Sequence, residues 1–350
     1  MKKIFLLILT ISLALIFSCS TKEKEKVIVK SNAFETLVSY IEENANILNN
    51  EDFPYFLLAS EVYQGIKKNF LIIDLRSEEA FEFEHIQNAI NISPNNLIDY
   101  FDNSINATSF DTIVFVCYTG QTSSFCTAGM RLLGYDNVYS LKHGLAAWDS
   151  TYAADYKFND ISSFLIDKLE TNDVEMHKTV DYPIIETENT EAYLILRERI
   201  QNEFNSKITD NFLKIQEIIA NPEQYYIASY LPKDIYLKGH IVGAVNYEPK
   251  NPFTKSKFLN SLPTDKTIII DCYNGIQSSL VIMYLRVLGY DAKNIYLGQN
   301  SFMYDKVVEQ GFPNRYFAEK DIENFPLEKT EAPTNTSEEA PKKVIPKGGC

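Results

Sequence analysis

The chain has 350 residues, with 47 acidic residues against 33 lysines and arginines, and its formal net charge is −14 at pH 7. No basic stripe is visible along the sequence, so we expect no nucleic-acid binding. The length suffices for two domains of ordinary size, each with its own core.

The N-terminus has the layout of a secretion signal. The chain begins Met-Lys-Lys, and residues 4–17 form an apolar run shorter than a membrane span needs. Ser18 and Cys19 follow this run and precede a polar segment, an arrangement that resembles the lipobox of bacterial lipoproteins. We therefore expect residues 1–18 to be removed and a lipid on Cys19 to anchor the protein outside the cytoplasmic membrane, at the periplasmic face or in the outer membrane. The alternative is an ordinary signal peptide with an incidental cysteine.

Beyond this segment, composition and periodicity divide the chain. We expect helices over residues 31–50, 56–66 and 190–204. Residues 156–186 have the mixed composition of a connector, and residues 328–349, rich in Pro, Thr, Glu and Lys, are expected to be disordered. The resulting division is a signal peptide (1–18), a linker (19–33), domain 1 (34–155), a connector (156–188), domain 2 (189–325) and a tail (326–350).

Two segments 155 residues apart share one layout around a cysteine. The first reads Cys-Tyr-Thr-Gly-Gln-Thr-Ser-Ser from Cys117, and the second reads Cys-Tyr-Asn-Gly-Ile-Gln-Ser-Ser from Cys272. The same offset aligns two Arg-x-Leu-Gly-Tyr-Asp segments that begin at Arg131 and Arg286. A register kept over this length indicates two copies of one domain.

Each cysteine has the same expected surroundings. Apolar runs over residues 113–116 and 268–270 are typical of buried parallel strands. Helical stretches over residues 123–133 and 278–288 follow, and a glycine closes each of them. Each thiol therefore lies where a strand ends and a helix begins, so loop N–H groups and the helix dipole favour a thiolate nucleophile there.

Further motifs in the first copy carry a family resemblance. Residues 71–76 end in Asp-x-Arg, residues 83–91 contain His-Ile-x-x-Ala-x-Asn, and residues 138–148 combine a strand, a glycine turn and a tryptophan. On these motifs the chain resembles the rhodanese (sulfurtransferase) family in its tandem form. The resemblance implies two α/β domains, each a central parallel sheet flanked by helices, and a loop cysteine that carries a persulfide between donor and acceptor.

Candidate site residues follow from the loops and from the resemblance. We expect Cys117 and Cys272 to be catalytic, and Asp74 and His85 to support the first site structurally. The expected substrate contacts are Tyr118, Thr119, Gly120, Gln121, Thr122, Ser123 and Arg76.

The sequence also departs from the family pattern. Glu84 and His143 occupy positions where the family usually has glycine. In the second copy Ser229 and Leu231 replace the Asp-x-Arg pair, and Phe302 is the nearest substitute for the tryptophan. We therefore expect the first domain to be the more active of the two.

Three functions compete. The leading one is transfer of sulfane sulfur from thiosulfate or a persulfide to a thiol or cyanide. A phosphatase of the same fold would need an arginine six residues after the cysteine, where this chain has Ser123 and Ser278. The third is a non-catalytic binding module at the cell surface.

Expected partners are a small sulfur-containing substrate or a protein thiol, together with the membrane through the lipid. We expect no cofactor and no metal, because no His/Cys spacing matches a zinc site. Cys126 is interpreted as a small buried residue, with pairing to Cys117 as the alternative. Cys350 is either a sulfur acceptor on a flexible arm or an exposed terminal thiol.

Overall fold

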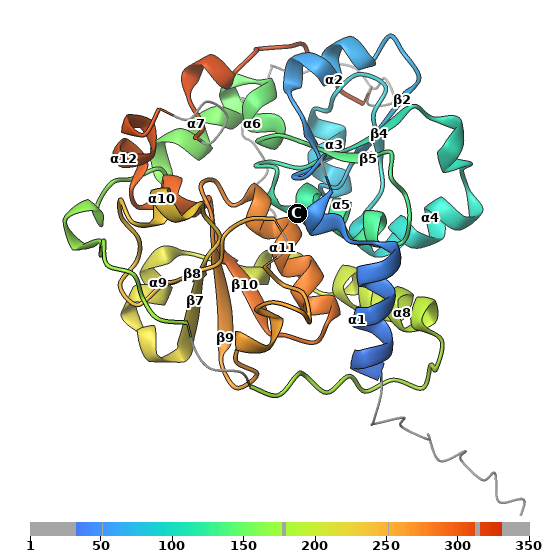
Figure 1. Ribbon diagram of the computed structural model, residues 1–350. Coiled ribbons are helices and arrows are strands. Elements are labelled where there is room, and N and C mark those ends of the chain that lie inside the picture. The colour runs from blue at the N-terminus through green and yellow to red at the C-terminus, as the bar shows by residue number, and fades with distance from the viewer. Residues whose placement is uncertain (1–32, 51, 177–179, 251, 312–315, 331–350) are drawn as a thin grey trace, which may run out of the picture.

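In the computed structural model the chain forms two parallel five-stranded sheets, each flanked by helices (Figure 1). This confirms the predicted fold class. The structure describes residues 33–50, 52–176, 180–250, 252–311 and 316–330, so the expected lipid site at Cys19 and the terminal Cys350 lie outside it. Among those residues, no helix is both long enough and apolar enough to traverse a lipid bilayer.

The first sheet has the strand order β1-β5-β4-β2-β3, and every pair is parallel. Its central strand β4 carries buried β-branched and aromatic side chains on both faces, as expected for a sheet covered on two sides. The elements are β1 (Phe56–Leu57), α2 (Ala59–Gly65), β2 (Phe70–Asp74), α3 (Glu78–Phe83), β3 (Ile90–Asn91), α4 (Leu97–Asn103), β4 (Thr112–Val116), α5 (Gln121–Leu132), β5 (Val138–Leu141), α6 (Gly144–Trp148) and α7 (Ser150–Asn159).

The second sheet repeats this order as β6-β10-β9-β7-β8, so the internal repeat in the sequence is also a structural repeat. The elements are β6 (Phe212–Leu213), α9 (Ile215–Ala220), β7 (Tyr225–Ser229), α10 (Lys233–Tyr236), β8 (Val245–Asn246), β9 (Thr267–Asp271), α11 (Ile276–Val287), β10 (Ala292–Ile295) and α12 (Tyr304–Glu309). Short 3-10 turns complete the chain: η1 (Ile47–Asn49), η2 (Pro94–Asn96), η3 (Ala107–Ser109), η4 (Ile166–Lys168), η5 (Ile208–Asn211), η6 (Pro222–Gln224), η7 (Leu259–Ser261), η8 (Gly298–Ser301) and η9 (Glu319–Asp321).

Two of the predicted helices are shorter than expected. The helix expected over residues 31–50 is α1 (Ala33–Asn44), which the 3-10 turn η1 follows. The helix expected over residues 56–66 starts only at Ala59, because Phe56 and Leu57 pair with β5 as the edge strand β1. The Glu61 carboxylate accepts the Leu58 N–H at 2.7 Å and caps the helix there.

One hydrophobic cluster spans both domains, beside a further cluster centred on each domain. Helices α5 and α11, which follow the two cysteine loops, pack against each other, and α8 (Ala192–Asn205) packs on α1, α5 and α11. Gly129 of α5 lacks a side chain where an ideal Cβ would lie 2.6 Å from the ring of Phe204 and 2.8 Å from Cε of Met283. The glycine therefore lets the two domains approach closely.

Each domain also contacts the chain segment that follows the other domain in sequence. After domain 1 the connector runs over domain 2, where Glu170 forms an antiparallel bridge with His240. After domain 2 the chain returns to domain 1 (Figure 1). There Glu328 forms the corresponding bridge with His85. The sequence places residues 326–330 in a tail with a disordered composition, but the structure has them in contact with domain 1. Trp148 Nε1 donates to the Pro326 carbonyl at 3.1 Å.

Candidate active site

Cys117 lies in a tight loop between β4 and α5. Its Sγ accepts hydrogen bonds from the N–H groups of Gly120 at 3.2 Å and Ser123 at 3.4 Å. Gly120 adopts the left-handed conformation with φ of +86°, which glycine reaches without strain and which turns the loop around the sulfur. Backbone donors that converge on a sulfur atom at a helix N-terminus stabilise negative charge on it.

A buried hydroxyl relay extends this contact. Ser123 Oγ lies 3.4 Å from Cys117 Sγ and 2.7 Å from Ser140 Oγ of β5. Ser124 Oγ donates to the same Ser140 Oγ at 3.1 Å. Sequence reasoning missed Ser140, although a polar residue in an otherwise apolar strand is the signal that could have indicated it.

The turn after β5 packs against the backbone of the Cys117 loop. An ideal Cβ on Gly144 would overlap the Cys117 carbonyl, which accepts the Leu145 N–H at 2.9 Å. His143 precedes this glycine with φ of +58°, so the histidine keeps the left-handed turn at a position where the family usually has glycine. Such a conformation costs a non-glycine residue on the order of 1–3 kcal/mol, and surrounding packing must offset it.

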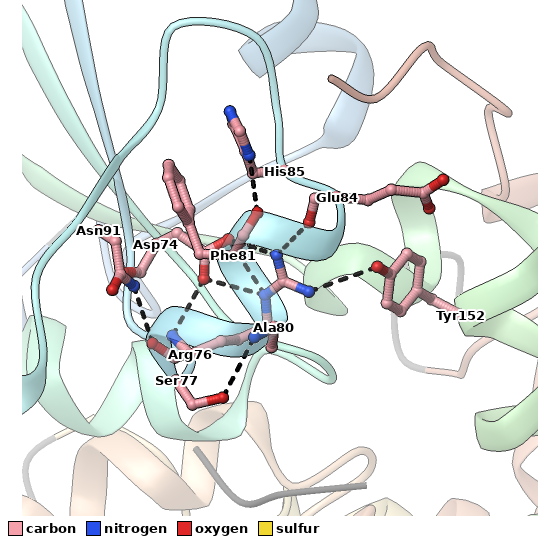
Figure 2. A network of polar contacts seen from close by, with 9 residues as sticks. All are labelled: Asp74, Arg76, Ser77, Ala80, Phe81, Glu84, His85, Asn91 and Tyr152. Atoms are coloured by element: carbon pink, nitrogen blue, oxygen red, sulfur yellow. Dashed lines mark hydrogen bonds and ion pairs between the residues drawn. The ribbon is translucent and has the colours of Figure 1, made fainter. Parts of the chain in front are cut away.

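Arg76 and Asp74 form a buried ion pair (Figure 2). The Arg76 Nη2 lies 2.7 Å from Asp74 Oδ2, and its Nε donates to Asp74 Oδ1 at 3.0 Å. The same Nη2 donates to the Glu84 carbonyl at 2.6 Å, and Nη1 faces the Tyr152 hydroxyl at 3.4 Å. Burial opposes the charge of Arg76, but the attraction of Asp74 outweighs it and raises the guanidinium pKa.

These contacts give Arg76 a structural role within the protein, and its expected contact with substrate stays a prediction. The guanidinium is 1% exposed and stands 5.2 Å from the centre of the Tyr118 ring. A cation over an aromatic face attracts it, so Arg76 holds the first loop residue in place. Arg76 is therefore a supporting residue of the loop.

His85 has the contacts of a structural residue. Its Nδ1 lies 2.8 Å from the Phe81 carbonyl, and its ring stacks on the Phe81 ring with centroids 3.9 Å apart (Figure 2). Its backbone N–H donates to the Glu328 carbonyl at 2.8 Å. The histidine thus connects α3 with the segment around Glu328.

The remaining candidate contacts separate into two groups. Tyr118 and Thr119 are half-buried at the start of the loop, whereas Thr122 and the Ser123 hydroxyl are buried. Gln121 is also fully buried, and its side chain contacts domain 2. Among these candidates, Tyr118 and Thr119 are therefore the side chains that a small molecule can reach.

Cys272 has a closely similar loop. Its Sγ accepts the Ser278 N–H at 3.2 Å and lies 3.2 Å from Ser278 Oγ. Gly275 turns the loop with φ of +78°, and Asn294 replaces Ser140 as the anchor in the neighbouring strand, donating to Ser278 Oγ at 3.1 Å. Burial raises the pKa of the Cys272 thiol, while hydrogen bonds from Ser278 and from the Asn274 backbone oppose that shift.

Domain 2 also has a buried carboxyl that sequence reasoning missed. Asp271 directly precedes Cys272 and is fully buried. Its Oδ2 accepts hydrogen bonds from Gln299 Nε2 at 3.1 Å and Ser229 Oγ at 3.3 Å, and its Oδ1 has no partner among the described residues. Burial raises the pKa of Asp271 to about 7, and the two hydrogen bonds oppose the shift.

A cavity of about 400 Å³ borders the second loop. Its walls are mainly apolar or uncharged, and Glu248 and Lys250 supply the charged groups. Domain 1 contributes part of the wall, so the cavity lies between the domains. The lining residues are Pro54, Phe56, Pro232, Glu248, Pro249, Lys250, Tyr273, Asn274, Ile276 and Gln277.

Comparison with known proteins identifies two rhodanese-like domains in the chain. The family model for the rhodanese-like domain matches residues 58–151 and 212–304. The thiosulfate sulfurtransferase GlpE of Pseudomonas paraeruginosa is 32% identical over 100 residues, which cover 28% of this chain and 87% of that protein. GlpE of Pseudomonas fluorescens Pf-5 is 30% identical over 86 residues, or 24% of this chain and 75% of that protein.

Among solved structures, a thiosulfate sulfurtransferase from Pseudomonas aeruginosa is similar to 77% of this chain over 46% of its own length. Its sequence identity is 14% and its TM-score is 0.28.

Proposed function

The chain belongs to the rhodanese-like family, and we propose that it carries sulfane sulfur as a persulfide on Cys117, with Cys272 as a second carrier. Similarity to thiosulfate sulfurtransferases supports sulfur transfer as the general chemistry. The observation that carries the proposal is the pair of N–H groups, from Gly120 and Ser123, within hydrogen-bond distance of the Cys117 sulfur.

In the first half-reaction the Cys117 thiolate attacks the outer sulfur of the donor. The bond from that sulfur to the rest of the donor breaks, and its electron pair leaves with sulfite from thiosulfate or with a thiolate from an organic persulfide. The loop N–H groups stabilise the developing charge on sulfur. In the second half-reaction an acceptor thiolate or cyanide attacks the outer sulfur, and Cys117 leaves as a thiolate.

The surroundings of the two loops favour an organic persulfide as donor at Cys272. Neither loop contains lysine or arginine, and Arg76 is buried, so a thiosulfate dianion would rely on backbone N–H groups. The cavity beside the Cys272 loop offers apolar walls with one cation, Lys250, and one anion, Glu248. That combination suits a small thiol compound with an amino group and a carboxylate.

The proposed location is the cell envelope, with the protein held outside the cytoplasmic membrane by a lipid on Cys19. Support comes from the sequence alone, through the apolar run that precedes Cys19 and the polar run that follows it.

The decisive experiment is direct. Purified protein without its signal segment is incubated with thiosulfate labelled in its outer sulfur or with cysteine persulfide, and each cysteine peptide is examined by mass spectrometry. Gain of one labelled sulfur atom on Cys117, removable by cyanide, is the expected result. A Cys117 that accepts no sulfur from either donor would leave the non-catalytic binding module as the better interpretation.

A further inference from the structure

Gln121 of the first loop reaches across the domain boundary to the second loop. Its Oε1 accepts the backbone N–H of Leu297 at 3.0 Å, and both residues are fully buried. An ideal Cβ on Gly275 would lie 2.6 Å from Gln121 Nε2 and 3.2 Å from Leu297 N. The Gln121 amide therefore packs directly against the glycine that turns the Cys272 loop.

Leu297 begins the turn on which the Cys272 loop rests. It adopts a left-handed conformation with φ of +60°, and Gly298 after it has no space for a side chain, because an ideal Cβ would overlap the Cys272 carbonyl. The next residue, Gln299, donates its N–H to that carbonyl at 2.9 Å. The hydrogen bond from Leu297 to Gln121 thus holds the first residue of this supporting turn in a strained conformation.

The residue of domain 2 that corresponds to Gln121 lacks its amide. In the aligned loops the residue that corresponds to Gln121 is Ile276, whose side chain has no hydrogen-bond acceptor. Ile276 therefore cannot make the same contact with the turn at His143. The first loop therefore stabilises the second through Gln121, and Ile276 does not stabilise the first loop in the same way.

We propose that Gln121 is a positioning residue for Cys272, acting from the other domain through Leu297. The inference rests on the proposed role of Cys272 as a sulfur carrier. The Ser278 and Asn274 N–H groups stabilise a Cys272 thiolate only while the loop keeps its shape, and a loosened supporting turn moves these donors off the sulfur. Gln121 therefore sets the reactivity of a thiol in the neighbouring domain, and its own loop depends on it less.

Gln121→Met keeps the length of the side chain and removes the acceptor. In the full chain, alkylation of each cysteine by iodoacetamide is followed over pH by mass spectrometry of its peptide. Cys272 should react roughly two- to ten-fold more slowly at neutral pH, the effect of one buried hydrogen bond, with its pH midpoint raised by up to about one unit. Cys117, although it shares a loop with Gln121, should change by less than about two-fold.

The control is Gln201→Met. Gln201 also donates across the domains, to the Asn95 carbonyl at 3.0 Å, but it lies on α8 away from both loops. This variant should leave Cys272 unchanged, which separates support of the loop from general loosening of the domain interface. If Gln121→Met does not fold, Gln121→Asn, which is one methylene too short to reach Leu297, decides the question.

An unchanged rate and midpoint at Cys272, or a larger loss at Cys117 than at Cys272, would overturn the proposal. Alkylation does not require sulfur transfer, so this result stands apart from the proposed function. Failure of Cys272 in the unaltered chain to accept sulfur from any donor would remove its carrier role, while the alkylation data would still report whether Gln121 positions it.

Discussion

Asp271 faces Ser229 across the neighbouring strands β9 and β7, and its carboxylate accepts the serine hydroxyl at 3.3 Å. In domain 1 the same register position pairs Asp74 of β2 with Val116 of β4. The buried acid has thus moved to the adjacent strand in domain 2, and Leu231 stands where domain 1 has the arginine that neutralises it. The two sites have the same kind of cysteine loop, but domain 1 has a buried ion pair near it and domain 2 has a buried carboxyl group without an arginine.

Asp271 should therefore make stability depend on pH. Its pKa is about 7 in the folded chain against an ordinary value of 3.8. Because the folded value is the higher one, the stability that the neutral form contributes is complete below about pH 3.8 and is lost as the pH rises through about 7. Asp271→Asn removes this loss. The advantage of this variant over the parent in free energy of unfolding should therefore increase by about 3 kcal/mol from pH 5 to pH 8. Urea unfolding of both chains at the two pH values measures the difference. A gain that is equal at both values would show that Asp271 does not titrate in this range.

The two cysteines should contribute unequally to turnover. Cys117→Ser is expected to abolish most sulfur transfer, while Cys272→Ser keeps more than half, because domain 1 retains the Asp74 and Arg76 pair. Steady-state rates of the two single variants with one sulfane donor measure this. Equal losses would mean that the domains work jointly, and the opposite ranking would contradict the assignment of Cys117 as the main carrier.

The ion pair itself can be tested with residues that domain 2 already uses. Arg76→Leu alone leaves the Asp74 carboxylate buried without its partner and should lower the free energy of unfolding by about 3–5 kcal/mol. Adding Asp74→Ser reproduces the Ser229 and Leu231 arrangement and should recover most of that loss. Denaturant unfolding of the single and double variants provides the measurement. A double variant as unstable as the single one would show that the arginine stabilises the domain through its packing on Tyr118 and Tyr152 instead.

Much of the fold could be predicted because its signals are local. The apolar runs, the glycines at φ of +86° and +78°, and the repeat offset each act within a few residues of the cysteines. The polar anchors Ser140 and Asn294 are as local, yet a single polar residue in a strand does not reveal its partner. Asp271 was missed for the same reason. Only its position between the neighbouring strands shows that its carboxylate is buried and has no arginine to pair with.

The rest depends on contacts between distant parts of the chain. Gln121 has the sequence position of a substrate contact, and only the packing of α5 against domain 2 shows that its amide is buried there. Phe56 and Leu57 fit a helical pattern, but pairing with β5 makes them a strand. Residues 326–330 have a polar composition, and their order comes from hydrogen bonds to Trp148 and His85.

The lipid anchor is testable without any structure of the N-terminus. Cys19→Ala removes the thiol to which the lipid would attach, so the variant should leave the membrane fraction and keep its signal segment uncleaved by the lipoprotein peptidase. Cell fractionation with detection of the protein, together with the mass of its N-terminal peptide, provides the measurement. Membrane association unchanged in the variant would contradict lipidation.

The trailing segment 316–330 should stabilise domain 1 although it follows domain 2 in the chain. Phe317 is 1% exposed and packs against His143 with ring centroids 5.0 Å apart, and Phe325 stacks on Tyr63 at 4.1 Å. A chain that ends at residue 315 loses both rings and the Glu328 bridge. Its free energy of unfolding should fall by at least about 3–5 kcal/mol, the effect of removing the one fully buried ring, that of Phe317.

The matched control is a chain that ends at residue 330. It keeps every described contact of the segment and should unfold at the same denaturant concentration as the full chain. The loss in the shorter chain should also concentrate in domain 1, because the rings pack there, and hydrogen exchange resolved by peptide would detect it around α3, α6 and the Cys117 loop. Equal protection of these elements in both truncated chains would show that the segment lies on domain 1 without stabilising it.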